Sequence, residues 1–180
     1  MPKKNEKPIQ ATVLTENVVA ELDDSDAKKL YDLSRFGERT DDQFQYALVE
    51  GFYLFKKGKM ILKSVHNRVI SERKFMKDVL KHDPQFKVRY SVYADLRDRG
   101  YIAKTALKFG ADFRVYDRGV KPGEDHAQWI VYPVHEGSAL TWYEFAAKNR
   151  VAHSTRKRLL LGIVDEEGDV TYYECKWLKP

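Results

Sequence analysis

The alternation of hydrophobic and polar positions predicts short strands and short helices in the first half of the chain. Residues 9–20 alternate loosely and predict a pair of strands joined by a turn. A helix is expected to begin near Asp23, where acidic side chains are favourable. Further helices are expected over residues 43–57 and 71–80, because their apolar side chains recur every three or four positions, with a short strand at 60–62 between them.

The tripeptide His82-Asp83-Pro84 interrupts these patterns and marks the predicted boundary between two domains, residues 1–84 and 85–180. Beyond it the pattern indicates a helix over residues 86–99 and three short strands over residues 101–105, 112–116 and 128–134. A last helix, opened by a T-x-x-E capping box at residues 141–144, runs into the stretch that begins at Arg150, and a hairpin follows over residues 159–177. We therefore predict the α+β class, with two small mixed α/β domains that each pack helices against a small mixed sheet.

Composition limits the classes of function. The net charge of +5 permits a polyanionic partner such as RNA. Cys175 is the single cysteine and the five histidines are scattered, so neither a disulfide framework nor a zinc spacing is present, and no metal or cofactor is expected. No apolar run approaches the roughly 18 residues of a membrane span, and the first residues lack a signal-peptide core, so we expect a cytoplasmic protein without a membrane partner.

A basic cluster near the end of the chain carries the strongest functional signal. Residues 150–164 read RVAHSTRKRLLLGIV, in which five basic or imidazole side chains are followed directly by an apolar strand. Such a cluster lies on the rim of a sheet, where a phosphate can reach it. The alternative is an ordinary solvated loop.

Three residues have the chemistry of a nuclease that needs no metal. Tyr116 ends a predicted strand, His126 follows the glycine-containing loop 117–125, and Lys157 precedes the strand after the basic cluster. Such a site needs a base for a ribose 2′-hydroxyl, an acid for the leaving 5′-oxygen and a cation for the phosphorane. A phenol is a weak base unless nearby cations favour its ionised form, whereas an imidazole exchanges protons near neutral pH. Taken singly, each residue is more typical of a core or a surface.

Together, these segments closely resemble the archaeal tRNA-splicing endonucleases. The resemblance rests on residues 90–119 (YSVYADLRDRGYIAKTALKFGADFRVYDRG), on His126, and on residues 150–173 (RVAHSTRKRLLLGIVDEEGDVTYY). It continues more weakly through residues 43–62 and so covers nearly the whole chain.

The family resemblance implies a reaction and its residues. It implies an endonuclease, a lyase in class, that excises introns from precursor tRNA by cutting both splice sites at a bulge–helix–bulge. Cleavage would be a metal-independent transesterification that leaves a 2′,3′-cyclic phosphate and a 5′-hydroxyl. The family's catalytic tyrosine, histidine and lysine fall on Tyr116, His126 and Lys157, which assigns catalysis to the C-terminal domain and a structural and assembly role to the N-terminal domain.

RNA binding and assembly are implied in the same way. Arg150 corresponds to the arginine that stacks on a bulged base, and Arg156 and Arg158 extend the RNA-binding set. The acidic turn would dock into a neighbouring subunit of a homotetramer; it contains Asp165, Glu166, Glu167 and Asp169.

Two alternatives remain open from the sequence. A non-catalytic structural subunit of a heteromeric splicing endonuclease would keep the fold but lack one or more of the three catalytic residues. A metal-dependent nuclease would need convergent carboxylates, for which Asp95 and Asp112 are the available pair.

Overall fold

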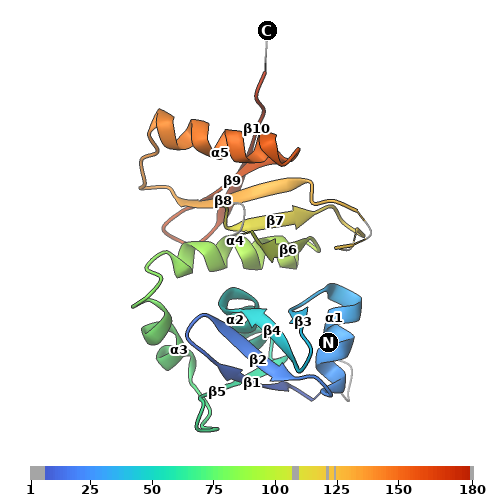
Figure 1. The fold of residues 1–180 in the computed structure, drawn as a ribbon. Coiled ribbons are helices and arrows are strands. Elements are labelled where there is room, and N and C mark those ends of the chain that lie inside the picture. Colours follow the sequence, from blue (N-terminus) through green and yellow to red (C-terminus); the bar gives the residue numbers. More distant parts are fainter. Residues whose placement is uncertain (1–6, 107–109, 121, 124, 179–180) are drawn as a thin grey trace. The chain divides into compact units, whose positions relative to one another are not determined.

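The computed structural model describes residues 7–106, 110–120, 122–123 and 125–178, and its chain divides into two compact units, Met1–Phe86 and Lys87–Pro180. Each unit has its own five-stranded mixed sheet with helices (Figure 1). This confirms the predicted α+β class with two small mixed domains. None of the described helices is both long enough and apolar enough to cross a membrane.

The N-terminal unit is a sheet in the order β3-β4-β2-β1-β5, in which only β1 and β5 run parallel among the described pairs. Its elements are β1 (Ile9–Val13), β2 (Asn17–Glu21), α1 (Ser25–Ser34), β3 (Glu38–Arg39), β4 (Gln43–Ala47), α2 (Leu48–Lys56), β5 (Met60–Lys63) and α3 (Glu72–Val79). The rings of Phe52 and Phe75 stack at 4.9 Å between centroids, and the ring of Phe86 meets both edge-on, so aromatic packing fills the core of this unit.

One predicted element of this unit is wrong. The helix expected over residues 43–57 begins only at Leu48, and β4 precedes it. Phe44 and Tyr46 are buried while the residues between and beside them are half-buried, which is the alternation of a strand. Pairing of Tyr46 with Val18 on β2 holds this strand in the sheet. The apolar positions of residues 43–47 are compatible with both a helix and a strand, and pairing with β2 selects the strand.

The C-terminal unit is a sheet in the order β10-β9-β8-β7-β6. Its elements are α4 (Phe86–Asp98), β6 (Ile102–Thr105), β7 (Phe113–Tyr116), β8 (Trp129–His135), α5 (Trp142–Ser154), β9 (Arg158–Val164) and β10 (Val170–Cys175). Helix α5 connects the parallel strands β8 and β9, and the other neighbours are antiparallel. The predicted capping box is present, because the Thr141 hydroxyl accepts from the backbone of Glu144 and the Glu144 carboxylate accepts from Thr141.

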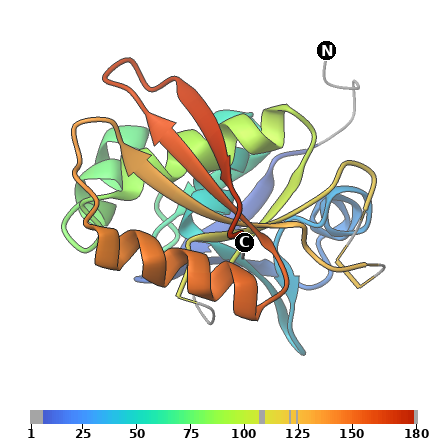
Figure 2. The same ribbon diagram turned by 90° about the horizontal axis from the view of Figure 1, so that it is seen from above.

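The two faces of this sheet pack against different helices. Ile130, Leu159 and Leu161 form a core with Ala152 of α5. On the other face, Phe113 packs against Tyr93 of α4, with 5.6 Å between ring centroids. Figure 1 shows α4 and α5 on opposite sides of the sheet, and Figure 2 shows β9 and β10 running as a hairpin beside them.

Gly162 of β9 lies against α4 so closely that a side chain there would collide. A Cβ atom at this position would lie 2.9 Å from a methyl group of Val92. The absence of a side chain therefore lets the helix approach the sheet.

Candidate active site

Three strand ends meet at one edge of the C-terminal sheet. The register pairs Val115 at the end of β7 with Trp129 at the start of β8, and Trp129 with Arg158 at the start of β9. Two further hydrogen bonds extend this ladder: the Gln128 amide donates to the carbonyl of Val115 at 2.8 Å, and the Arg158 amide donates to the carbonyl of Gln128 at 2.9 Å. This edge therefore brings together segments that are far apart in the sequence.

The predicted tyrosine and histidine flank this edge. Tyr116 is the last residue of β7 and only 5% exposed, so its ring is held by packing. The alternation of β7 directs Tyr116 and Arg114 to the α5 face of the sheet. His126 is exposed three residues before β8, and its backbone N–H donates to the carboxylate of Asp125 at 2.6 Å. The loop before it is described except for Lys121 and Glu124, which lie outside the described residues.

Lys157 is held by the turn that ends α5. Its amide donates to the carbonyl of Ala152 at 2.8 Å, and the amide of Arg156 donates to that of His153 at 3.0 Å. This pair of bonds around a left-handed residue, Arg156 with φ of 54°, is a Schellman motif. The Lys157 ammonium donates to the carbonyl of Thr155, 2.9 Å away. The end of the helix thus fixes both the backbone and the side chain of Lys157.

The expected RNA-binding arginines separate into two groups. Arg150 is exposed on α5 and Arg156 is exposed in the turn after it. Arg158 begins β9, so it shares a face with Leu160, on the α4 side of the sheet. There its guanidinium lies 3.4 Å from the carboxylate of Glu174. The RNA contact expected of Arg158 stays a prediction, and this ion pair would compete with it.

Comparison with known sequences assigns the chain to a family. The family described as tRNA intron endonuclease, catalytic C-terminal domain, matches residues 86–172, and its N-terminal domain matches residues 9–76. The chain belongs to the tRNA intron endonuclease family. It is similar to proteins named tRNA-splicing endonuclease from three archaea: Nanoarchaeum equitans (46% identity, 81% of this chain and 97% of the relative), Thermococcus onnurineus (40%, 84% and 86%) and Methanothermobacter thermautotrophicus (37%, 93% and 96%).

Trp177 of this tRNA intron endonuclease family member follows β10 and contacts the last turn of α5. The Trp177 ring meets the His153 ring edge-on at 4.6 Å and remains 61% exposed. An exposed indole therefore lies beside His153 of α5.

The acidic turn between β9 and β10 is ordered by one of its own carboxylates. The Asp165 side chain accepts hydrogen bonds from the backbone amides of Glu167 at 3.0 Å and Asp169 at 2.9 Å. Glu166 and Glu167 are exposed. Asp165 thus shapes the turn, whereas the other acidic side chains of the predicted assembly loop are exposed, with the Glu166 carboxylate 3.8 Å from the His135 imidazole.

The carboxylates of the metal-dependent alternative both bind arginines. Asp95 lies 2.7 Å from Arg99, and Asp112 lies 2.9 Å from Arg89. Within the described residues, no three His, Cys, Asp or Glu side chains are grouped so as to hold a metal ion.

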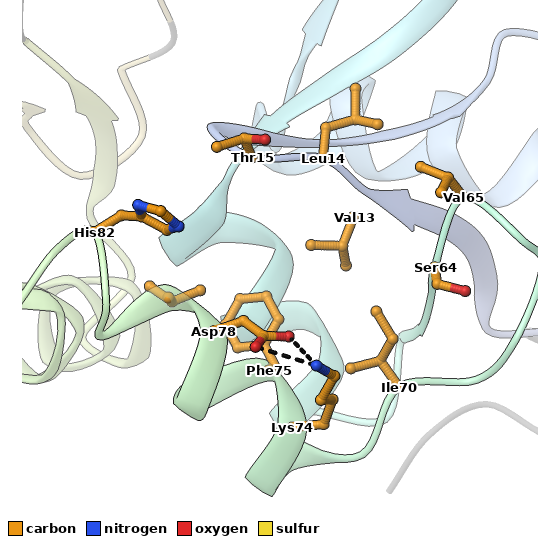
Figure 3. A pocket seen from close by; sticks show the side chains of 11 residues that line it. Val13, Leu14, Thr15, Ser64, Val65, Ile70, Lys74, Phe75, Asp78 and His82 are labelled. Atoms are coloured by element: carbon orange, nitrogen blue, oxygen red, sulfur yellow. Dashed lines mark hydrogen bonds and ion pairs between the residues drawn. The ribbon is translucent and has the colours of Figure 1, made fainter.

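A cavity of about 450 Å³ lies in the N-terminal unit and contains none of the predicted site residues (Figure 3). Its walls are mostly apolar and come from the β1–β2 turn, the loop after β5 and helix α3. The Lys74 ammonium on its rim is paired with the Asp78 carboxylate at 2.8 Å. His82 also lines the cavity, but none of Tyr116, His126 and Lys157 does, so the cavity is not built from the predicted catalytic set.

Proposed function

We propose that this chain is a tRNA-splicing endonuclease that excises introns from precursor tRNA by cutting both splice sites at a bulge–helix–bulge. The observation that carries the proposal is the meeting of the β7, β8 and β9 ends at one edge, each with one of Tyr116, His126 and Lys157. Family membership supports the same activity. The C-terminal unit would perform the chemistry, and the N-terminal unit would serve structure and assembly.

The reaction we propose is a transesterification within the RNA. The Tyr116 phenolate oxygen takes the proton of the ribose 2′-hydroxyl, and the 2′-oxygen forms a bond to phosphorus. The bond from phosphorus to the 5′-oxygen breaks, and His126 gives that oxygen a proton. The products are a 2′,3′-cyclic phosphate and a 5′-hydroxyl, without a metal. The ammonium of Lys157 stabilises the extra negative charge of the phosphorane.

Substrate contacts would come from the α5 side of the sheet. Arg150 is exposed on α5 and would stack on a bulged base, and Arg156 would contact phosphate. The exposed Trp177 ring, beside His153 of α5, offers a second stacking surface. Stacking tolerates any base, so the geometry of the bulges rather than their sequence would select the cut site.

We also propose a homotetramer. Strand β10 is an edge of its sheet and carries exposed Tyr173, so it can pair with the same strand of a second copy. The exposed carboxylates of the acidic turn would then join two such pairs. The alternative of a non-catalytic structural subunit is less favoured, because this chain has all three catalytic residue types at the predicted positions.

Replacement of the three residues tests the proposal. His126→Ala and Lys157→Ala should each slow single-turnover cleavage of an intron-containing precursor tRNA by about 10²–10⁴. Tyr116→Phe keeps the buried ring and removes only the hydroxyl, so a comparable loss would identify the base. RNA affinity and thermal stability should change little in all three. Cleavage at the wild-type rate in any of them would remove that residue from the mechanism.

A further inference from the structure

A network of side chains crosses the sheet behind the candidate active site. The Trp129 indole N–H donates to the Glu174 carboxylate at 2.9 Å, and the same carboxylate oxygen lies 3.4 Å from the Arg158 guanidinium. Trp129 also meets the ring of Tyr101 edge-on at 6.0 Å, and the Arg118 guanidinium lies over that ring at 4.8 Å. We call these five residues the back-face network. It joins the starts of β6, β8 and β9 to β10 and to the loop after β7.

The network lies on the face of the sheet opposite to Tyr116. Trp129, Arg158 and Glu174 share the α4 face through the register of β8, β9 and β10, whereas Tyr116 belongs to the α5 face. Each candidate catalytic residue nevertheless has a network member close by in the chain. Arg118 is two residues after Tyr116, Trp129 is three after His126, and Arg158 directly follows Lys157. A displacement of the network would therefore move the backbone near all three candidate catalytic residues.

Glu174 is the centre of this arrangement. The hydrogen bond from Trp129 holds the pKa of its carboxyl below the usual range, and the Arg158 and Lys176 cations act in the same direction. A single exposed ion pair contributes little to stability. Here one carboxylate binds side chains from two neighbouring strands, the indole N–H of Trp129 on β8 and the guanidinium of Arg158 on β9. It therefore holds the starts of both strands relative to β10.

We infer that Glu174 is a positioning residue of the cleavage reaction: by binding Trp129 and Arg158, it fixes the strand starts that carry His126 and Lys157. This inference rests on the proposed function. Because the Glu174 side chain lies on the α4 face and makes none of the proposed substrate contacts, its replacement should leave RNA binding intact. The assembly mass is measured in parallel, because β10 is also the proposed assembly edge. Small displacements of reacting groups slow chemistry strongly, by up to about 10²-fold for about 1 Å. We therefore expect loss of the Glu174 side chain to lower the rate of the chemical step.

The test compares single-turnover rates and RNA dissociation constants of Glu174→Ala, Glu174→Gln and Trp129→Phe. Glu174→Ala should slow cleavage about tenfold with an RNA dissociation constant within about twofold of wild type. Glu174→Gln should recover most of the rate, since its amide oxygen still accepts from the indole. Trp129→Phe in the Glu174→Ala background should add no further loss, because the hydrogen bond from Trp129 to Glu174 is already absent there. Glu72→Gln is the control, as it alters an exposed ion pair, with Lys56 at 3.0 Å, in the other unit.

Several outcomes would overturn the inference. A wild-type rate for Glu174→Ala, or a loss confined to RNA affinity, would remove Glu174 from positioning. Multiplicative losses in the double variant would show that Trp129 and Glu174 act independently. A change in assembly mass that accompanies the loss would assign Glu174 to assembly instead. Cleavage by the wild-type protein tests the proposed function, and only the ratio of variant to wild type tests the network, so the two can fail separately.

Discussion

The amide of Lys157 donates a hydrogen bond of 2.8 Å to the carbonyl of Ala152, and this bond closes the last turn of α5 around the left-handed residue Arg156. The candidate catalytic lysine thus takes its position from the end of a helix, where a glycine is the usual left-handed residue. The same turn therefore strains the backbone of Arg156 and positions Lys157. Variants of Arg156 can measure the effect of the turn on stability and on cleavage.

Arg156→Gly and Arg156→Val should differ although both remove the same charge. Glycine relieves a left-handed cost of about 1–2 kcal/mol but adds about 0.5–1 kcal/mol of unfolded-state entropy, so the free energy of unfolding should stay within about 1 kcal/mol of wild type. A β-branched valine fits this conformation poorly and should lower the free energy of unfolding by about 1–3 kcal/mol. Urea unfolding measures both. The Arg156→Val protein should also cleave RNA more slowly than the Arg156→Gly protein. Equal rates would show that the conformation of this turn does not control the position of Lys157.

Salt dependence should distinguish stacking from phosphate contact. RNA affinity should fall linearly with salt on a log–log plot, with a slope set by the phosphates neutralised. Arg150→Ala should weaken binding by about 1–3 kcal/mol if the guanidinium stacks on a base, with the slope almost unchanged. Arg156→Gly, which removes the proposed phosphate contact, should reduce the slope by about 1. Fluorescence anisotropy over a salt series measures both, and a reversed pattern would exchange the two roles.

The acidic turn should join two dimers through its exposed carboxylates. The double variant Glu166→Lys with Glu167→Lys should reduce the tetramer to dimers, because it reverses charge while Asp165 still orders the turn. Asp165→Asn is the matched control, since an amide oxygen can accept the same two backbone bonds, and it should remain a tetramer. Light scattering gives the mass. A tetramer that persists in the double variant, or a monomeric wild type, would contradict this assembly.

Stability at alkaline pH should depend on Tyr46. Burial raises the pKa of this phenol, with the nearby carboxylates of Glu50 and Asp24 adding to the effect. The folded state therefore keeps the proton that the unfolded chain loses above about pH 10, so stability falls by about 1.4 kcal/mol per pH unit from there. Tyr46→Phe should remove that slope and, since the hydroxyl has no partner among the described residues, leave neutral-pH stability equal or slightly higher. Parallel slopes for both proteins in alkaline unfolding curves would contradict this.

Local signals predicted much of the fold. The capping box at Thr141 and Glu144 and the alternation of residues 113–116 depend on neighbours in the chain, and both elements appear where expected. Strand β4 was missed because its identity depends on pairing with β2, far away in the sequence. A helical spacing of aromatic residues carries no information about such a pairing.

The candidate site shows the same limit. Tyr116, His126 and Lys157 could be nominated because each stands at the end of an element. The meeting of the three segments that carry them depends on the pairing of Val115, Trp129 and Arg158, which no local pattern contains. Glu174 lies 45 residues from Trp129, so its hydrogen bond was invisible in the sequence.

The central claim is that the RNA's own 2′-hydroxyl is the nucleophile, and one substitution in the substrate tests it. A precursor tRNA with a single 2′-deoxynucleotide on the 5′ side of one splice site is incubated with the protein, and both junctions are followed. We predict that the modified junction stays intact while the unmodified one is cut to a 2′,3′-cyclic phosphate and a 5′-hydroxyl. Cleavage at the deoxynucleotide, or a product that ends in a 3′-hydroxyl, would mean that water attacks the phosphate and would contradict the mechanism.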